Sequence, residues 1–155
     1  MLVRGGDAVV IDFPRCDKGP ILLDIATLDV SIFFDSAPTP PRSDDHSEKH
    51  QKELEKEFNR KSDEWKTVVC DAFSPATVLK LPSQKVGHEP FARHWASVRQ
   101  LRRLALLDQK DNREYGICMS IELLRRAMFP DNNPTVAGYA YYLADRLTKS
   151  LGTGS

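Results

Sequence analysis

AVVIDFPRCDKGPILLDIATLDVSIFFD, residues 8–35, is the stretch that decides the fold. It opens with the apolar run Ala8–Ile11, passes through a link containing proline and glycine, and continues with apolar residues near helical spacing from Ile21. The short apolar run predicts a strand, and the later spacing predicts a buried helix over 21–35. Pro20 suits the first position of that helix, because its fixed φ is already helical.

The residues before this stretch predict a second strand. Leu2 and Val3 are apolar, and Arg4-Gly5-Gly6-Asp7 separates them from Ala8–Ile11. A Gly-Gly-Asp turn between β-forming residues is typical of a hairpin. A two-stranded hairpin is marginal by itself, so we expect residues 1–13 to pack on helices or to belong to a larger sheet.

The rest of the chain predicts helices separated by proline-containing segments. Residues 36–47 hold three prolines and form a loop. We expect residues 47–151 to make a helical subdomain, with residues 152–155 as a disordered tail. Its helices are expected over 47–70, from near Glu89 after an irregular stretch that begins at Ser74-Pro75, over 112–128, and over 135–151. The predicted fold is therefore mainly α, a single domain over 1–151 with a short N-terminal β-hairpin packed on about five helices.

Composition narrows the function classes. The 22 basic and 22 acidic residues balance, so net charge does not favour a nucleic acid or an anionic membrane as partner. No apolar run reaches the roughly 20 residues that a membrane helix needs. The three cysteines are far apart, which argues against a disulfide framework and a zinc site. We expect a cytoplasmic protein.

Two aspartates in the deciding stretch suggest a chemical role. Asp12 ends the apolar strand, and Asp24 lies early in the following helix. A carboxylate on a rigid strand end can hold Mg²⁺ against nucleotide phosphates, since this ion prefers oxygen ligands. The structural alternative is that Asp12 caps a strand end and that Asp24 is an ordinary acid at the positive end of a helix dipole.

The motif Ile11-Asp12-Phe13, then Gly19-Pro20, then Leu23-Asp24-Ile25-Ala26 resembles the aminoglycoside and choline phosphotransferase branch of the protein-kinase-like fold. It looks especially like predicted phosphotransferases of bacterial signalling and conflict systems. The resemblance covers roughly residues 2–35 and implies the C-terminal lobe of such an enzyme. It implies that Asp12 ligates magnesium bound to ATP, that Asp24 supports the catalytic loop, and that Asp29 is peripheral to the site or on the surface.

The chain departs from that family in two places. Pro14 follows Asp12-Phe13 where protein kinases have glycine, although this branch is less strict there. The family's His-Gly-Asp and Asn would lie before Met1, and the chain contains no His-x-Asp, strand lysine or Gly-rich loop. Phosphoryl transfer needs all of these parts together. We therefore expect a C-terminal fragment that is inactive alone, with an unknown phosphate acceptor.

An alternative interpretation is a non-catalytic helical interaction module of a multidomain bacterial regulator. The missing loop and the long charged helix over 47–70 motivate it. A hairpin without its sheet would expose apolar surface, so we also expect a protein partner or a homodimer.

Other polar residues favour structural roles. His46 and His50 share a helix face but have no third ligand nearby, so a solvated helix start is favoured over a metal site. Cys16 has no neighbouring histidine to activate it. Arg99, Arg102 and Arg103 have i, i+3, i+4 spacing, and an exposed basic helix edge is favoured over a phosphate site.

Overall fold

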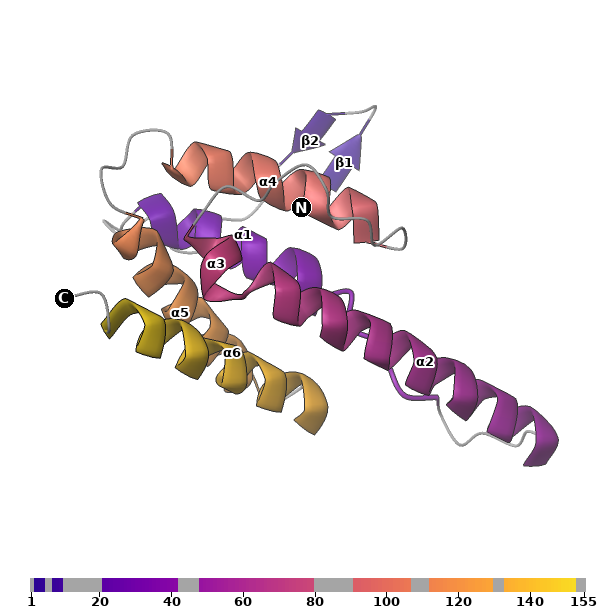
Figure 1. Ribbon diagram of the computed structural model, residues 1–155. Helices are drawn as coiled ribbons and strands as arrows, with labels where there is room; N and C mark the ends of the chain where they lie inside the picture. The colour runs from indigo at the N-terminus through magenta and orange to yellow at the C-terminus, as the bar shows by residue number, and fades with distance from the viewer. Residues whose placement is uncertain are drawn as a thin grey trace.

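The computed structural model of the 155-residue chain describes residues 2–4, 7–9, 21–41, 48–79, 91–106, 112–129 and 133–152 (Figure 1). These residues are mainly helical, as the sequence predicts. Their elements are β1 (Leu2–Arg4), β2 (Asp7–Val9), α1 (Ile21–Phe34), α2 (Glu48–Ala72), α3 (Pro75–Val78), α4 (Ala92–Leu106), α5 (Arg113–Ala127) and α6 (Pro134–Gly152).

The two strands are short and antiparallel. Leu2 pairs with Val9 and Arg4 with Asp7, so β2 begins one residue before the apolar run that predicts it. Each strand has three residues, and Figure 1 draws the pair at the edge of the helical part, near α4. The packing of this pair on the helices stays a prediction.

Helix α1 lies at the centre of the packing. It contacts α4 on one side and α5 on another, and α5 in turn packs along α6. The α1 sequence is apolar nearly all round, which is typical of a buried helix. Its buried apolar residues are Leu22, Ala26, Val30, Phe33 and Phe34.

Aromatic rings join α1 to its neighbours. Phe33 makes edge-to-face contacts with Phe73 and Trp95, at centroid distances of 5.7 and 5.4 Å. Phe34 meets Trp65 of α2 edge-on at 5.6 Å, and the Trp65 indole N–H donates to the Phe33 carbonyl at 2.9 Å. Such rings bury large apolar areas and prefer these tilted geometries, so they fix the position of α1 against α2 and α4.

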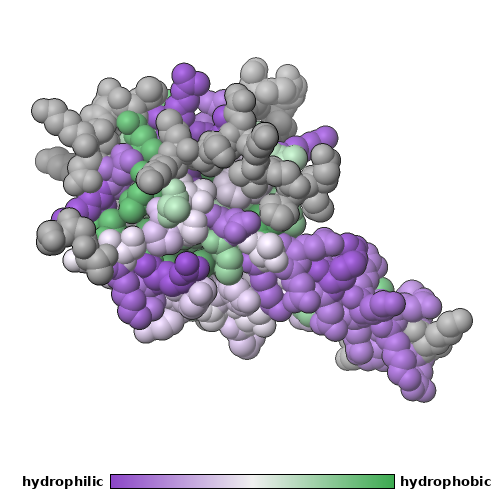
Figure 2. Space-filling view, in the orientation of Figure 1, coloured by the Kyte–Doolittle hydropathy of each residue, from purple (hydrophilic) through white to green (hydrophobic). Residues whose placement is uncertain are grey.

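Helix α2 is packed only in its C-terminal half. Trp65 and Val69 are buried, whereas Leu54 and Phe58, closer to the N-terminal end of the helix, are half-buried. Figure 2 shows the rest of α2 as a hydrophilic arm that projects from the body of the molecule. The arm carries exposed ion pairs such as Lys52–Glu48 and Lys61–Glu57.

The structure corrects two predictions. The segment from Ser74 is not irregular at its start, because Pro75 opens the one-turn helix α3. Proline has no N–H to leave unpaired and favours helical φ, so it initiates a helix here rather than breaking one. The predicted tail is also too long, since α6 continues to Gly152. The other helices agree with their predicted ranges within about three residues.

Within the residues that the structure describes, no helix combines the length and apolarity needed to cross a membrane.

Candidate functional site

The structure describes one of the two aspartates that the sequence nominates. Asp24 lies in the first turn of α1 with its side chain exposed. This placement suits the positive end of the helix dipole and leaves the carboxylate accessible. Asp12 lies outside the described residues, and so does Cys16. The separation of Asp12 from Asp24 therefore stays untested, together with the proposed metal role of Asp12.

Asp29 and Arg102 form the most buried polar site in the described part of the chain. Both side chains are fully buried. Arg102 Nε donates to Asp29 Oδ2 at 2.6 Å, and Arg102 Nη2 donates to Asp29 Oδ1 at 3.0 Å. Two parallel bonds of this kind make the strongest form of arginine–carboxylate pair. The resemblance implied that Asp29 is peripheral to the site or on the surface. The surface position is wrong, because the side chain lies inside the core.

Tyr115 and two backbone carbonyls complete this buried cluster. The Tyr115 hydroxyl donates to Asp29 Oδ2 at 2.7 Å. Arg102 Nη1 donates to the Ala72 carbonyl at 2.8 Å and the Thr77 carbonyl at 3.3 Å. The guanidinium also lies over the Phe73 ring, 5.6 Å from its centroid. One arginine on α4 therefore binds α1, the end of α2, and α3, while α5 reaches the same carboxylate.

Electrostatics raise the pKa of two groups in this cluster, Tyr115 and Arg102. Burial raises the pKa of Tyr115, and the Asp29 charge raises it further. Burial alone would lower the pKa of Arg102, but Asp29 and Tyr115 raise it overall. The tyrosine stays neutral and the arginine charged across the physiological range. Because each nitrogen of the guanidinium and the tyrosine hydroxyl donate to protein acceptors inside the core, the role of the cluster is to hold helices together rather than to bind substrate.

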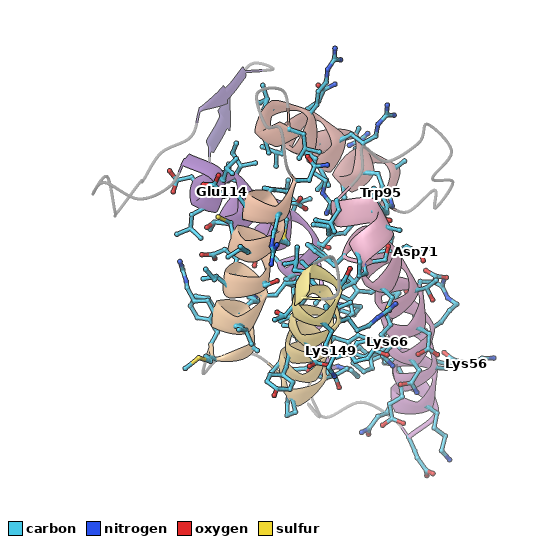
Figure 3. The ribbon with its side chains drawn as sticks, turned by 60° about the vertical axis from the view of Figure 1, so that its left-hand side comes forward. Lys56, Lys66, Asp71, Trp95, Glu114 and Lys149 are labelled. Atoms are coloured by element: carbon cyan, nitrogen blue, oxygen red, sulfur yellow. The ribbon has the colours of Figure 1, made fainter. Side chains whose placement is uncertain are left out.

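The sequence interpretation of Arg102 is wrong. The spacing of Arg99, Arg102 and Arg103 favoured an exposed edge, and Arg103 is indeed exposed, but Arg102 is completely buried. The signal that could have found it is the apolar stripe of α4. Trp95, Val98 and Ala105 are buried at a spacing that places Arg102 on the same stripe (Figure 3 labels Trp95).

A pocket of about 460 Å³ opens between α2 and α6. A side chain at Gly138 would meet no atom within 4 Å, so the helix backbone there faces open space. The rings of Tyr139 and Tyr142 meet edge-to-face at an interplanar angle of 78°, with centroids 6.5 Å apart. Its lining is formed by Cys70, Pro134, Thr135, Gly138, Tyr139 and Tyr142.

The thiol of Cys70 lines this pocket, and its surroundings make it a poor nucleophile. Burial raises the pKa of its thiol, partly offset by the Arg146 charge, and Asp71 raises it further. Catalytic thiols need a lowered pKa and a neighbouring base. Among the described residues that line the pocket there is neither a histidine nor a carboxylate. The described lining is therefore mainly apolar.

Metal ligands do not gather among the described residues, where no group of three or more His, Cys, Asp or Glu side chains is close enough to share an ion. His46 lies outside the described ranges. His50 lies in the first turn of α2 and its side chain is exposed, in agreement with the predicted helix start.

Comparison of the chain with known proteins finds no matching family model, no matching curated protein and no matching solved structure.

Proposed function

We propose that this chain is the C-terminal part of an ATP-dependent, kinase-like phosphotransferase that acts on a small molecule or a protein, and that it transfers no phosphate alone. The observation that supports the proposal is the exposed carboxylate of Asp24 in the first turn of α1. In the sequence, Asp24 comes after the strand pair β1–β2 and after Asp12, which is the order of these parts in the motif.

Each aspartate has a separate role in this proposal. Asp12 would ligate magnesium, which in nucleotide sites is held by one or two carboxylates together with phosphates and water. A dedicated cage of protein ligands is therefore not required. Asp24 would accept hydrogen bonds from the backbone of the catalytic loop, which an accessible carboxylate at a helix start can do. A magnesium ion held by Asp12 would supply positive charge that offsets the negative charge of the nucleotide phosphates.

The proposal is tested by measuring Mg-ATP binding by calorimetry. The chain by itself should not bind, whereas the chain preceded by an in-frame segment with His-Gly-Asp and Asn should bind and transfer phosphate. In that longer protein Asp12→Ala should weaken Mg-ATP binding by at least about tenfold, because the loss of a magnesium ligand costs more than about 1.4 kcal/mol.

Two variants separate the roles and control for general damage. Asp24→Ala should lower the transfer rate more than the Mg-ATP affinity, since it supports the loop rather than the metal. Asp63→Ala, in an exposed position on α2, should change neither quantity. If the longer protein bound Mg-ATP equally well with and without Asp12, the metal assignment would be wrong.

A second candidate is a non-catalytic helical interaction module of a multidomain regulator. The hydrophilic arm of α2 favours it, because a helix that projects without burying its face offers surface to a partner. This candidate requires that the longer protein also ignore nucleotide. Saturable Mg-ATP binding by that protein, lost in Asp12→Ala, would exclude it.

A further inference from the structure

The pocket between α2 and α6 has the size of a small-molecule site. Its volume of about 460 Å³ lies within the usual range of roughly 300–1,000 Å³ for ligand pockets. One face of α6 forms much of its wall, because Pro134, Gly138 and Tyr142 follow one another at i, i+4 spacing. Cys70 lines the pocket from the side of α2.

Gly138 keeps the pocket open, and the packing of α6 does not require a glycine there. It lies inside the helix, where glycine is less favourable than alanine because its flexible backbone must be ordered. Packing does explain Gly116 of α5, since a Cβ there would lie 2.9 Å from the side chains of Leu79 and Leu151. A Cβ at Gly138 would meet no atom within 4 Å. The missing side chain therefore adds space to the pocket rather than room for a neighbouring helix.

The two tyrosines of the pocket belong to a chain of rings that begins in the core. Trp65 of α2 is buried and meets the Tyr139 ring at a centroid distance of 6.0 Å and an interplanar angle of 69°. Tyr139 in turn meets Tyr142 edge-to-face, and Tyr142 remains 48% exposed. Rings held in this way offer contact area to a planar ligand at a small cost in side-chain entropy.

A positive charge lies at one end of this face of α6. Arg146 is the next residue of the row after Tyr142, and its guanidinium lies 5.6 Å from the centroid of that ring. Within the described part of the chain, no carboxylate forms an ion pair with Arg146. Burial raises the pKa of the Cys70 thiol and the Arg146 charge opposes this rise, so the charge acts across the pocket. Asp71 acts on the same thiol, but it is not among the described lining residues.

We propose that this pocket binds a small planar aromatic molecule that carries an anionic group, with its rings against Gly138 and the tyrosines and its anion toward Arg146. Apolar walls with a few polar groups are the usual composition of such sites, and a guanidinium is a good partner for a carboxylate. This binding is independent of phosphate transfer, which is argued from Asp24 on α1.

Calorimetric titration with 2-naphthoate, which has two fused rings and a carboxylate, tests the proposal. The full chain should bind it saturably, with a Kd between about 10 μM and 1 mM for a ligand of this size. The neutral analogue 2-naphthalenemethanol should bind about two- to fivefold more weakly, because it lacks the charge that meets an exposed arginine. Arg146→Gln should remove this difference.

Two leucine variants locate the bound molecule. Gly138→Leu should fill the hollow and weaken 2-naphthoate binding by at least about tenfold, without lowering the melting temperature, because the space for the new side chain is open. Gly152→Leu is the matched control, since a Cβ at this α6 glycine also meets nothing within 4 Å, and it should bind like the unmodified chain. Tyr142→Ala removes a half-exposed ring and should weaken binding even if Gly138→Leu proves unstable.

Protection of Cys70 gives a second location. Because the thiol lines the pocket, saturating 2-naphthoate should slow its alkylation by N-ethylmaleimide, which mass spectrometry follows in the peptide that contains it. Cys118, which is buried in α5, is the internal reference, and its alkylation should not change.

The proposal is wrong if 2-naphthoate shows no saturation up to about 5 mM. It is also wrong if Gly138→Leu and Tyr142→Ala both bind the probe as well as the unmodified chain, since the probe then binds elsewhere. Equal affinity for the neutral analogue, with no effect of Arg146→Gln, would contradict the anionic class of the ligand.

Discussion

At the scale of single residues, the fold depends on the ion pair between Asp29 and Arg102, whose side chains are both fully buried. Arg102 satisfies both oxygens of Asp29 and two carbonyls, and Tyr115 adds one more hydrogen bond to the carboxylate. A buried ion pair stabilises little compared with an apolar replacement of both partners, but the removal of one partner leaves an uncompensated charge. The cluster therefore specifies how the helices meet more than it adds to stability.

Replacement of one partner of this pair should be severe. Arg102→Met should lower the free energy of unfolding by about 3–5 kcal/mol, because the Asp29 carboxylate remains buried without its counter-charge. Arg103→Met on the exposed side of α4 should change it by less than about 0.5 kcal/mol. Urea denaturation of both variants provides the comparison, and equal losses would contradict the structural role of Arg102.

The tyrosine of the cluster predicts a pH dependence. Its pKa is raised above the ordinary value of 10.0 by burial and by Asp29. Above pH 10 the unfolded chain loses the tyrosine proton while the folded chain retains it, so stability falls as pH rises, by up to about 1.4 kcal/mol per unit. Below pH 10 the contribution of Tyr115 is fully present.

Tyr115→Phe should separate this effect from the other titrating groups. At pH 8 the variant should be less stable by about 1–3 kcal/mol, since Asp29 loses a hydrogen bond. Between pH 10 and 11 its stability should decline less steeply than that of the unmodified protein, so the difference narrows. Thermal melts across this range measure both slopes, and parallel slopes would show that Tyr115 ionises normally in the folded state.

At the scale of elements, two glycines in neighbouring helices illustrate what packing decides. A Cβ at Gly138 of α6 would meet nothing within 4 Å. A Cβ at Gly116 of α5 would lie 2.9 Å from methyl groups of Leu151 and Leu79. Glycine in a helix interior is less favourable than alanine by up to about 1 kcal/mol, so the same substitution should have different outcomes.

Gly138→Ala should raise the free energy of unfolding by about 0.5–1 kcal/mol, because helix propensity improves without a clash. Gly116→Ala should gain less or lose stability, since the two leucine tips must move inside the core. Differential scanning calorimetry of the two variants gives the order directly. A larger gain at Gly116 than at Gly138 would contradict the packing between α5 and α6.

At the scale of the whole molecule, the arm of α2 lacks the contacts that stabilise the body. The first buried side chains of α2 are Ser62 and Trp65, and the described side chains before them are exposed or half-buried. Its ion pairs are largely exposed, and such pairs contribute little to stability. A helix of this kind opens locally without unfolding the rest.

Amide hydrogen exchange should therefore divide α2 into two parts. Residues 51–58 should exchange much faster than residues 65–72, because only the second group is held by the core. Mass spectrometry makes this measurement on the full chain. Uniform slow exchange along α2 would mean that a partner copy or another segment covers the arm.

The amino-acid pattern by itself determined where the five longer helices lie, though not the one-turn helix α3, because amphipathic spacing, proline and glycine act locally. The ranges of α1, α2, α5 and α6 follow from it closely. It also nominated Asp24 at a helix start, where the side chain is accessible. These properties need no knowledge of which helices are neighbours.

Only the tertiary structure determined that Asp29, Arg102 and Tyr115 are buried together in one cluster. Arg102 lies 73 positions after Asp29 in the sequence, and Tyr115 lies 86 positions after it. No local sequence pattern identifies these residues as partners. Charged residues on helix stripes are usually solvated, so sequence reasoning left Arg102 on the surface. The packing of α1 between α4 and α5 brings opposite charges together inside the core, and a buried charge is tolerable only where such a partner is in place.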